Sequence, residues 1–166
     1  PVFAGAVYLQ FPWSAHVMDQ MGAALDALEP QAAVTYAEAG GWGRALVLEA
    51  RRRGISTVGL QHGFIYRHWL NYLHEPDEMA PSPSNPADGG FPVPTRTLVY
   101  DRFAAAHLTS AGRFKPESVV ITGSPRLDAL VATAGALEPG DLDRLRQRAG
   151  GESARTLVVV AAKYTQ

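Results

Sequence analysis

Cysteine is absent from the 166 residues, and the chain also lacks a charge excess. Without cysteine, neither disulfides nor thiolate metal sites can form. No apolar run reaches the roughly 18 to 20 residues of a membrane span, and no signal-peptide pattern is found. Fifteen basic and 16 acidic residues give a net charge of -1, so no global field draws the chain to nucleic acid or anionic lipid. The absence of cysteine fits a protein of a reducing compartment.

Apolar segments of two kinds alternate along the chain, and 46% of its residues are hydrophobic, enough for the core of one domain. Continuous apolar runs, typical of buried strands, alternate with segments whose apolar residues recur at helical spacing. The expected strands are residues 3–9, 32–40, 55–63, 96–100, 117–123 and 155–162. The expected helices are residues 14–28, with Ser14 as N-cap, 41–54, 101–112, 124–134 and 141–149. This alternation predicts an α/β fold, a Rossmann-like parallel sheet with helices on both faces.

One long connection, residues 64–94, interrupts the alternation and is rich in proline. Connections of this length in a compact domain are usually binding loops or disordered inserts. Its first part, "FIYRHWLNYL" at 64–73, is too aromatic for a solvated linker, so we expect it to be ordered. We expect the part with "APSPSNPADGG", 80–90, to be mobile.

Polar side chains and glycines lie at the carboxyl ends of four of the expected strands or directly after them. In a parallel sheet the carboxyl ends of the strands lie along one rim, and ligands bind there. The four clusters are Glu38 with Gly40, Gly41 and Gly43; Gln61, His62 and Gly63; Asp101 and Arg102; and Gly123, Ser124, Pro125 and Arg126. The sequence therefore predicts a ligand site at this rim.

His62 is the leading candidate for chemistry, because imidazole can act as a base near neutral pH and the end of a strand fixes its position. The alternative is a core histidine satisfied by a neighbouring carbonyl. The other clusters have structural alternatives: "GGWG" could cradle a phosphate or only form a tight turn. Ser124 and Asp101 are typical N-caps. Arg126 in a first helical turn opposes the helix dipole, which points to an outside partner.

Metal and hydrolase chemistry are poorly supported. His68 and His74 follow His62 at spacings that match no zinc motif, and no carboxylate partner accompanies them. No GxSxG elbow is present for a serine hydrolase. We expect no metal.

The order of "EAGGWGRALVLEARRRGI", "STVGLQHGFI", "LVYDRFAAAHLTSAG" and "VVITGSPRLDAL" resembles one family. It is similar to the N-terminal, acceptor-side domain of GT-B glycosyltransferases of bacterial surface-polysaccharide pathways, among them capsule and CDP-glycerol polymer transferases. The resemblance covers roughly residues 33–133, and "QHG" with "TGSPRLD" carries it. It implies one half of a GT-B architecture. Residues 1–135 would form the acceptor-side domain, and residues 136–166 a linker helix and the first strand of a donor-binding domain that lies mostly outside the chain.

The resemblance also implies roles for the rim. His62 matches the histidine of the family's His-Gly motif, a base that deprotonates the acceptor hydroxyl. Acceptor contacts are expected from the aromatic loop, at Tyr66, Arg67, Trp69 and Tyr72, because flat rings stack on sugars. The further candidates for substrate binding are Glu38, Gly41, Arg44, Gln61, Gly63, Asp101, Ser124 and Arg126.

The implied reaction moves a sugar or polyol phosphate from a nucleotide-activated donor to a glycan or lipid-linked acceptor. No cofactor other than this donor substrate is expected, and no nucleic acid. Relatives of this kind work in the cytoplasm, some at the inner face of the membrane.

Two alternatives stay open. Nucleotide-sugar 2-epimerases share the two-domain plan, but they usually carry His-x-Glu-Ala-Gly where this chain has "LQHGF". A non-catalytic glycan-binding or assembly module would leave the chemistry of His62 unused.

Overall fold

A computed structural model describes residues 2–36, 38–84 and 89–149. The chain divides into two units between Ser124 and Pro125, about ten residues before the boundary that the resemblance suggested. The first unit holds the sheet, and the second holds α5 (Pro125–Gly135) and α6 (Pro139–Arg148). The strand expected at residues 155–162 lies outside the described residues.

The N-terminal segment is helical, so the strand predicted at residues 3–9 is wrong. Helix α1 (Val2–Gly5), the π-helical turn η1 (Ala6–Gln10) and α2 (Phe11–Leu28) follow one another without a break. A short apolar run fits a strand and a buried helix equally well. The π-helical turn ends two residues before Pro12, which has no N–H to continue the helical ladder. Ser14 therefore lies inside a helix and is not its N-cap.

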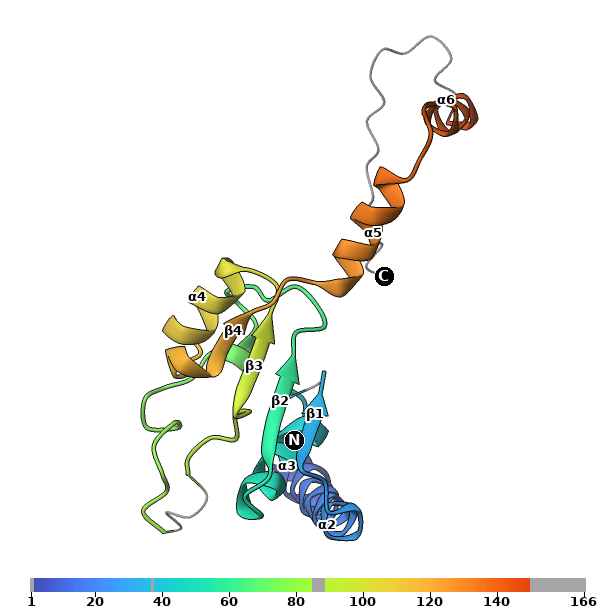
Figure 1. Cartoon of the computed structure of the whole chain (residues 1–166). Helices are drawn as coiled ribbons and strands as arrows, with labels where there is room; N and C mark the ends of the chain where they lie inside the picture. Colours follow the sequence, from blue (N-terminus) through green and yellow to red (C-terminus); the bar gives the residue numbers. More distant parts are fainter. Residues whose placement is uncertain (1, 37, 85–88, 150–166) are drawn as a thin grey trace. The chain divides into compact units, whose positions relative to one another are not determined.

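The remaining elements of the first unit follow the predicted alternation (Figure 1). They are β1 (Ala32–Thr35), α3 (Gly41–Arg52), β2 (Ser56–Leu60), η2 (Leu70–Tyr72), β3 (Arg96–Val99), α4 (Arg102–Ser110), η4 (Pro116–Ser118) and β4 (Val119–Ile121). Helix α3 ends before Gly54, whose φ of +68° suits glycine. Asp101 caps α4 as expected: its Oδ1 accepts from Phe103 N at 2.9 Å and Ala104 N at 2.8 Å.

The four strands form one parallel sheet in chain order, β1-β2-β3-β4. The register pairs Val34 with Val58, Leu60 with Leu98, and Val99 with Ile121. A four-stranded parallel sheet with helical connections confirms the α/β prediction, and it is consistent with a Rossmann-like fold.

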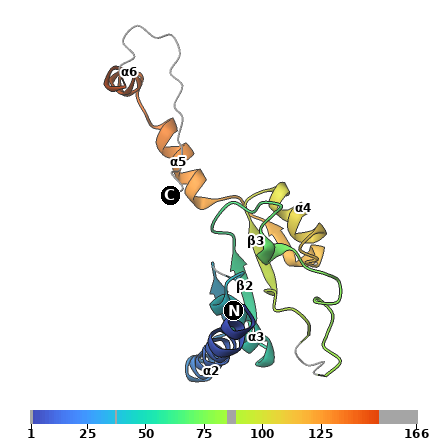
Figure 2. The ribbon, with the colours of Figure 1, turned by 180° about the vertical axis from the view of Figure 1, so that it is seen from behind.

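The helices of the first unit cover one face of this sheet. Thr57, Thr97 and Val99 point to that face and are at most 3% exposed. Because each crossover moves one strand in the same direction, right-handed connections place α3 and α4 on the same side (Figures 1 and 2). On the other face Val34 is 61% and Val120 39% exposed. Within the described residues of the first unit, helices on both faces are thus not found.

Helix α2 packs against α3, and α3 packs against the sheet. Arg53, just after α3, binds both carboxylate oxygens of Asp26 in α2, at 2.6 and 2.8 Å. It also donates to Glu49 Oε2 at 2.6 Å. The bidentate pair ties the outer helix to the inner one. Among the described residues, no helix combines the length and the apolar character needed to cross a membrane.

Candidate functional site

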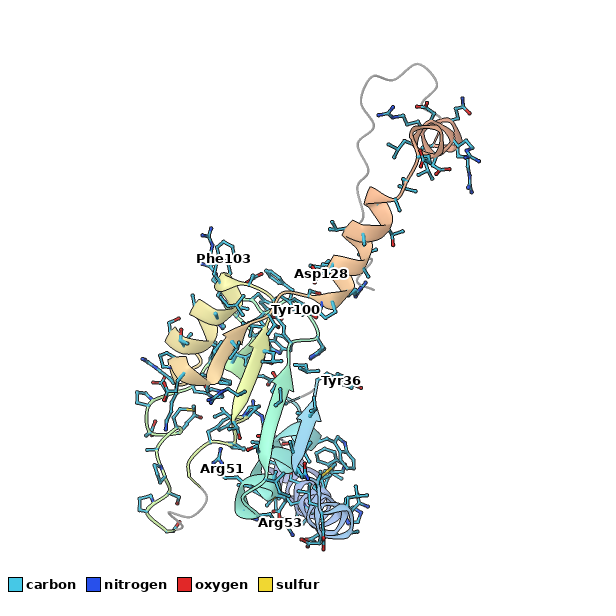
Figure 3. All side chains as sticks on the ribbon, viewed as in Figure 1. Tyr36, Arg51, Arg53, Tyr100, Phe103 and Asp128 are labelled. Atoms are coloured by element: carbon cyan, nitrogen blue, oxygen red, sulfur yellow. The ribbon has the colours of Figure 1, made fainter. Side chains whose placement is uncertain are left out.

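His62 lies just beyond the carboxyl end of β2 and is exposed. Its ring stands edge-on to Tyr36, with 5.9 Å between centroids, and to Trp69, with 6.3 Å. Tyr36 follows β1, and Figure 3 shows it at the same end of the sheet as Tyr100, which follows β3. The alternative of a buried core histidine is therefore wrong. An exposed imidazole held between two aromatic rings can exchange a proton with a bound ligand.

Gln61 fixes the backbone on which His62 sits. Its backbone N donates to Leu98 O at 2.9 Å. Its side chain accepts from Tyr100 N at 2.7 Å through Oε1 and donates to Gly63 O at 2.8 Å through Nε2. Gln61 is only 7% exposed. We expected it to bind substrate, but the structure gives it the role of holding the turn that carries His62.

Gly63 is not needed for that turn. Its φ is not in the left-handed region, and a Cβ added there would meet nothing within 4 Å. The space beside Gly63 is therefore open.

A row of aromatic rings continues from His62 along the loop. Phe64 stacks on Tyr66, with 6.5 Å between centroids and planes 9° apart, and Tyr66 stacks on Trp69 at 5.9 Å and 14°. Phe64 is 78% and Tyr66 49% exposed. We call Tyr36, Phe64, Tyr66 and Trp69 the aromatic wall. Exposed flat rings of this kind suit the apolar faces of sugars.

Below the aromatic wall lies a buried carboxylate. Glu38 is 2% exposed, and its Oε1 accepts a hydrogen bond of 2.5 Å from the Tyr72 hydroxyl. Burial raises the pKa of Glu38, while the bond from Tyr72 and the charges of His62 and Arg44 act in the opposite direction. The Oε2 atom of Glu38 has no partner among the described residues.

Arg44 holds the other side of this buried cluster. It donates to Ala39 O at 3.1 Å and Asn71 O at 2.9 Å. Its guanidinium lies 4.1 Å from the centre of the Phe91 ring, and burial lowers its pKa. Arg44 therefore links the start of α3 to the aromatic loop, so its groups are used inside the fold.

The other residues predicted to bind substrate differ in what their side chains contact. Asp101 is exposed at the rim, but its Oδ1 caps α4. Arg67 donates to Nε2 of its neighbour His68 at 2.9 Å. A Cβ on Gly41 would lie 2.8 Å from the Trp13 ring, so this glycine allows α2 to pack against α3. Ser124 is buried in the first unit. Arg126 belongs to the second unit.

Two parts of the site were missed in the sequence. Tyr36 directly follows the β1 segment, and its place at the strand end was the available signal. The Phe91 ring contacts the guanidinium of Arg44. It also contacts the ring of His74, with 4.1 Å between the two ring centroids. His74 is 8% exposed, and burial lowers its pKa. No local pattern points to that stack.

The part of the chain that the structure describes holds no group of three or more His, Cys, Asp or Glu placed to bind a metal ion. Comparison of the chain with protein-family models, curated proteins and solved structures found no match.

Proposed function

We propose that this chain is the acceptor-side half of a GT-B-type glycosyltransferase and that His62 is its general base. The observation that carries the proposal is the exposed imidazole of His62 between Tyr36 and Trp69. It lies at the strand rim where α/β proteins bind ligands. The resemblance of the "QHG" and "TGSPRLD" segments to surface-polysaccharide transferases supports the same assignment.

The chemistry follows from this placement. A sugar or polyol acceptor rests against the aromatic wall with a hydroxyl near His62. The imidazole takes the hydroxyl proton as the oxygen forms its new bond to the donor's anomeric carbon, or to phosphorus for a polyol phosphate. The bond to the nucleotide breaks, and the nucleotide leaves with the electron pair.

By the same proposal, the donor is a nucleotide-activated sugar held by a second domain beyond α6. The acceptor is a glycan or a lipid-linked glycan, in the cytoplasm or at the inner face of the membrane. Gln61, Glu38 and Arg44 hold the site in shape, and the aromatic wall provides the acceptor contacts.

The test uses the full-length protein with UDP-, GDP-, CMP- and CDP-linked donors and an acceptor extract, with nucleotide release as the readout. We expect release from one donor, reduced at least about a hundredfold in His62→Ala, the lower range for a general base. His68→Ala is the matched control, because His68 is an exposed histidine of the same loop; it should keep wild-type rates within a few-fold. Equal activity of wild type and His62→Ala would remove His62 from the reaction.

A glycan-binding module is the second candidate, favoured by the exposed stack of Phe64 and Tyr66. It predicts glycan binding that Tyr66→Ala abolishes and His62→Gln leaves intact, without nucleotide release from any donor. That pattern would replace the transferase proposal.

A further inference from the structure

A cavity lies at the opposite end of the sheet from His62. It has a volume of about 430 Å³ and borders the amino ends of β3 and β4. In Figure 3, Arg51 on its wall lies at the end of the strands away from Tyr36 and Tyr100. The volume is within the usual range for small-molecule sites, roughly 300 to 1,000 Å³.

The lining of this cavity is cationic. Its described residues include four cations, Arg51, Arg96, Arg113 and Lys115, and one carboxylate, Glu117. Arg96 donates to the carbonyl of Thr95 at 3.0 Å. Arg96, Arg113 and Lys115 make no ion pair within the described residues. Among the described residues, three cations without an ion pair thus line the cavity together with one carboxylate.

Arg51 builds the wall of the cavity. Its guanidinium donates to the carbonyls of Gly90 at 3.1 Å, Phe91 at 3.2 Å and Val93 at 3.4 Å. These bonds attach residues 90–93 to α3. Gly90 has a φ of +77°, and a Cβ there would collide with the Met79 carbonyl. The wall is therefore held by specific contacts.

Arg113 occupies a position that favours another residue type. Its φ is 57°, in the left-handed region where glycine and asparagine are common and long side chains are strained. Strained positions of this kind cluster at ligand sites. Here the strained residue places a guanidinium on the cavity.

The cavity also has an apolar part. Met79, Phe91, Val93 and Pro94 line it. A neighbouring cavity of about 290 Å³ shares Arg51, Val93 and Thr95 with it and continues to Val47. We call the larger cavity, which is lined by both the cations and these apolar side chains, the groove.

We propose that this groove binds a small organic anion, a phosphate or carboxylate on a short apolar body. Arg96, Arg113 and Lys115 take the anionic group, and Val93 and its neighbours take the body. Arginine suits this role because its planar guanidinium can bind two oxygens of a phosphate or carboxylate at once. The site is separate from His62 and does not depend on the proposed transferase reaction.

The test is calorimetric titration at constant physiological ionic strength, with phenyl phosphate, inorganic phosphate and phenylacetate as probes. We expect saturable binding of phenyl phosphate or phenylacetate, at least about tenfold tighter than inorganic phosphate, because the ring buries apolar surface. The tighter of the two aromatic probes identifies the anionic group. Inorganic phosphate binding as tightly as both of them, or no saturable binding at all, would overturn the proposal.

The variant Arg113→Gln with Lys115→Gln should weaken binding at least about tenfold. Arg67→Gln with Arg102→Gln is the matched control, since it removes the same charge from exposed residues outside the cavity; it should bind as wild type does. Equal weakening in both would reveal only general charge attraction and defeat the proposal.

The variant Arg113→Gly tests whether a loss of affinity can occur without a loss of folding stability. Glycine tolerates the positive φ, so this variant should unfold at the same denaturant concentration as wild type or higher. It should still lose affinity for the aromatic probe. Unchanged affinity in this folded variant would remove Arg113 from the site.

Discussion

The Tyr72 hydroxyl donates a hydrogen bond of 2.5 Å to Oε1 of Glu38, and both side chains are 2% exposed. Glu38 follows β1, whereas Tyr72 belongs to the loop between β2 and β3. The bond therefore attaches the aromatic loop to the strand rim and gives a buried carboxylate its donor. Burial raises the pKa of Tyr72, so the phenol keeps its proton and donates throughout the neutral range.

Tyr72→Phe should destabilise the protein by about 2 kcal/mol, because it leaves a buried carboxylate oxygen without its donor. The measurement is the free energy of unfolding in urea at neutral pH. Tyr36→Phe is the matched control: Tyr36 is 68% exposed, so loss of its hydroxyl should change stability by less than about 0.5 kcal/mol. If both variants unfold at the same urea concentration, the Glu38 bond contributes nothing measurable.

Glu38 should also give stability a specific pH dependence. Burial raises its pKa above the ordinary value of 4.5, so the folded state holds the proton more tightly than the unfolded chain. The stabilisation from this proton is complete below pH 4.5 and is lost as the pH rises through the folded-state pKa.

Glu38→Gln isolates this effect, because the amide oxygen can still accept from Tyr72 but the side chain cannot ionise. The unfolding free energy of wild type minus that of Glu38→Gln should decrease as the pH rises from acid to neutral. Urea denaturation across that range measures it. A difference that stays constant, or that increases with pH, would show that burial does not raise the pKa of this carboxyl.

Gly90 and Gly63 should respond differently to alanine. Gly90→Ala must place a Cβ against the Met79 carbonyl at a positive φ, so we expect a loss of more than about 1 kcal/mol. Gly63→Ala places its methyl group in open space and should stay within about 0.5 kcal/mol of wild type. Thermal or urea unfolding of both variants checks the pair. A Gly90→Ala protein as stable as Gly63→Ala would contradict the described contact.

The sheet could be predicted because its signals are local. The apolar runs of β1 to β4, Gly54 after α3 and Asp101 before α4 lie within a few residues of the elements they define. The N-terminal helices could not be separated from a strand, since residues 3–9 are a short apolar run without an unambiguous period. Helices on the second face of the sheet were expected only because they are typical of the fold class. No local sequence pattern indicates them.

The sequence predicted where the candidate site lies. It did not predict which of the polar side chains there form hydrogen bonds inside the fold. Strand ends placed Glu38, Gln61 and His62 on one rim correctly. Sequence alone did not show that Gln61 binds Tyr100 N, or that Glu38 binds Tyr72, because those partners lie far along the chain. A polar residue at a strand end looks the same whether its side chain is free for a ligand or used inside the fold.

The chain order of the strands has a consequence for how the protein folds during synthesis. Each strand pairs with the one made just before it, so the sheet can grow in the order in which residues leave the ribosome. The connection from β2 to β3 runs through residues 61–95 and carries the largest closure entropy of the three. We therefore expect the addition of β3 to be the slow step, with β1 and β2 already paired on α3.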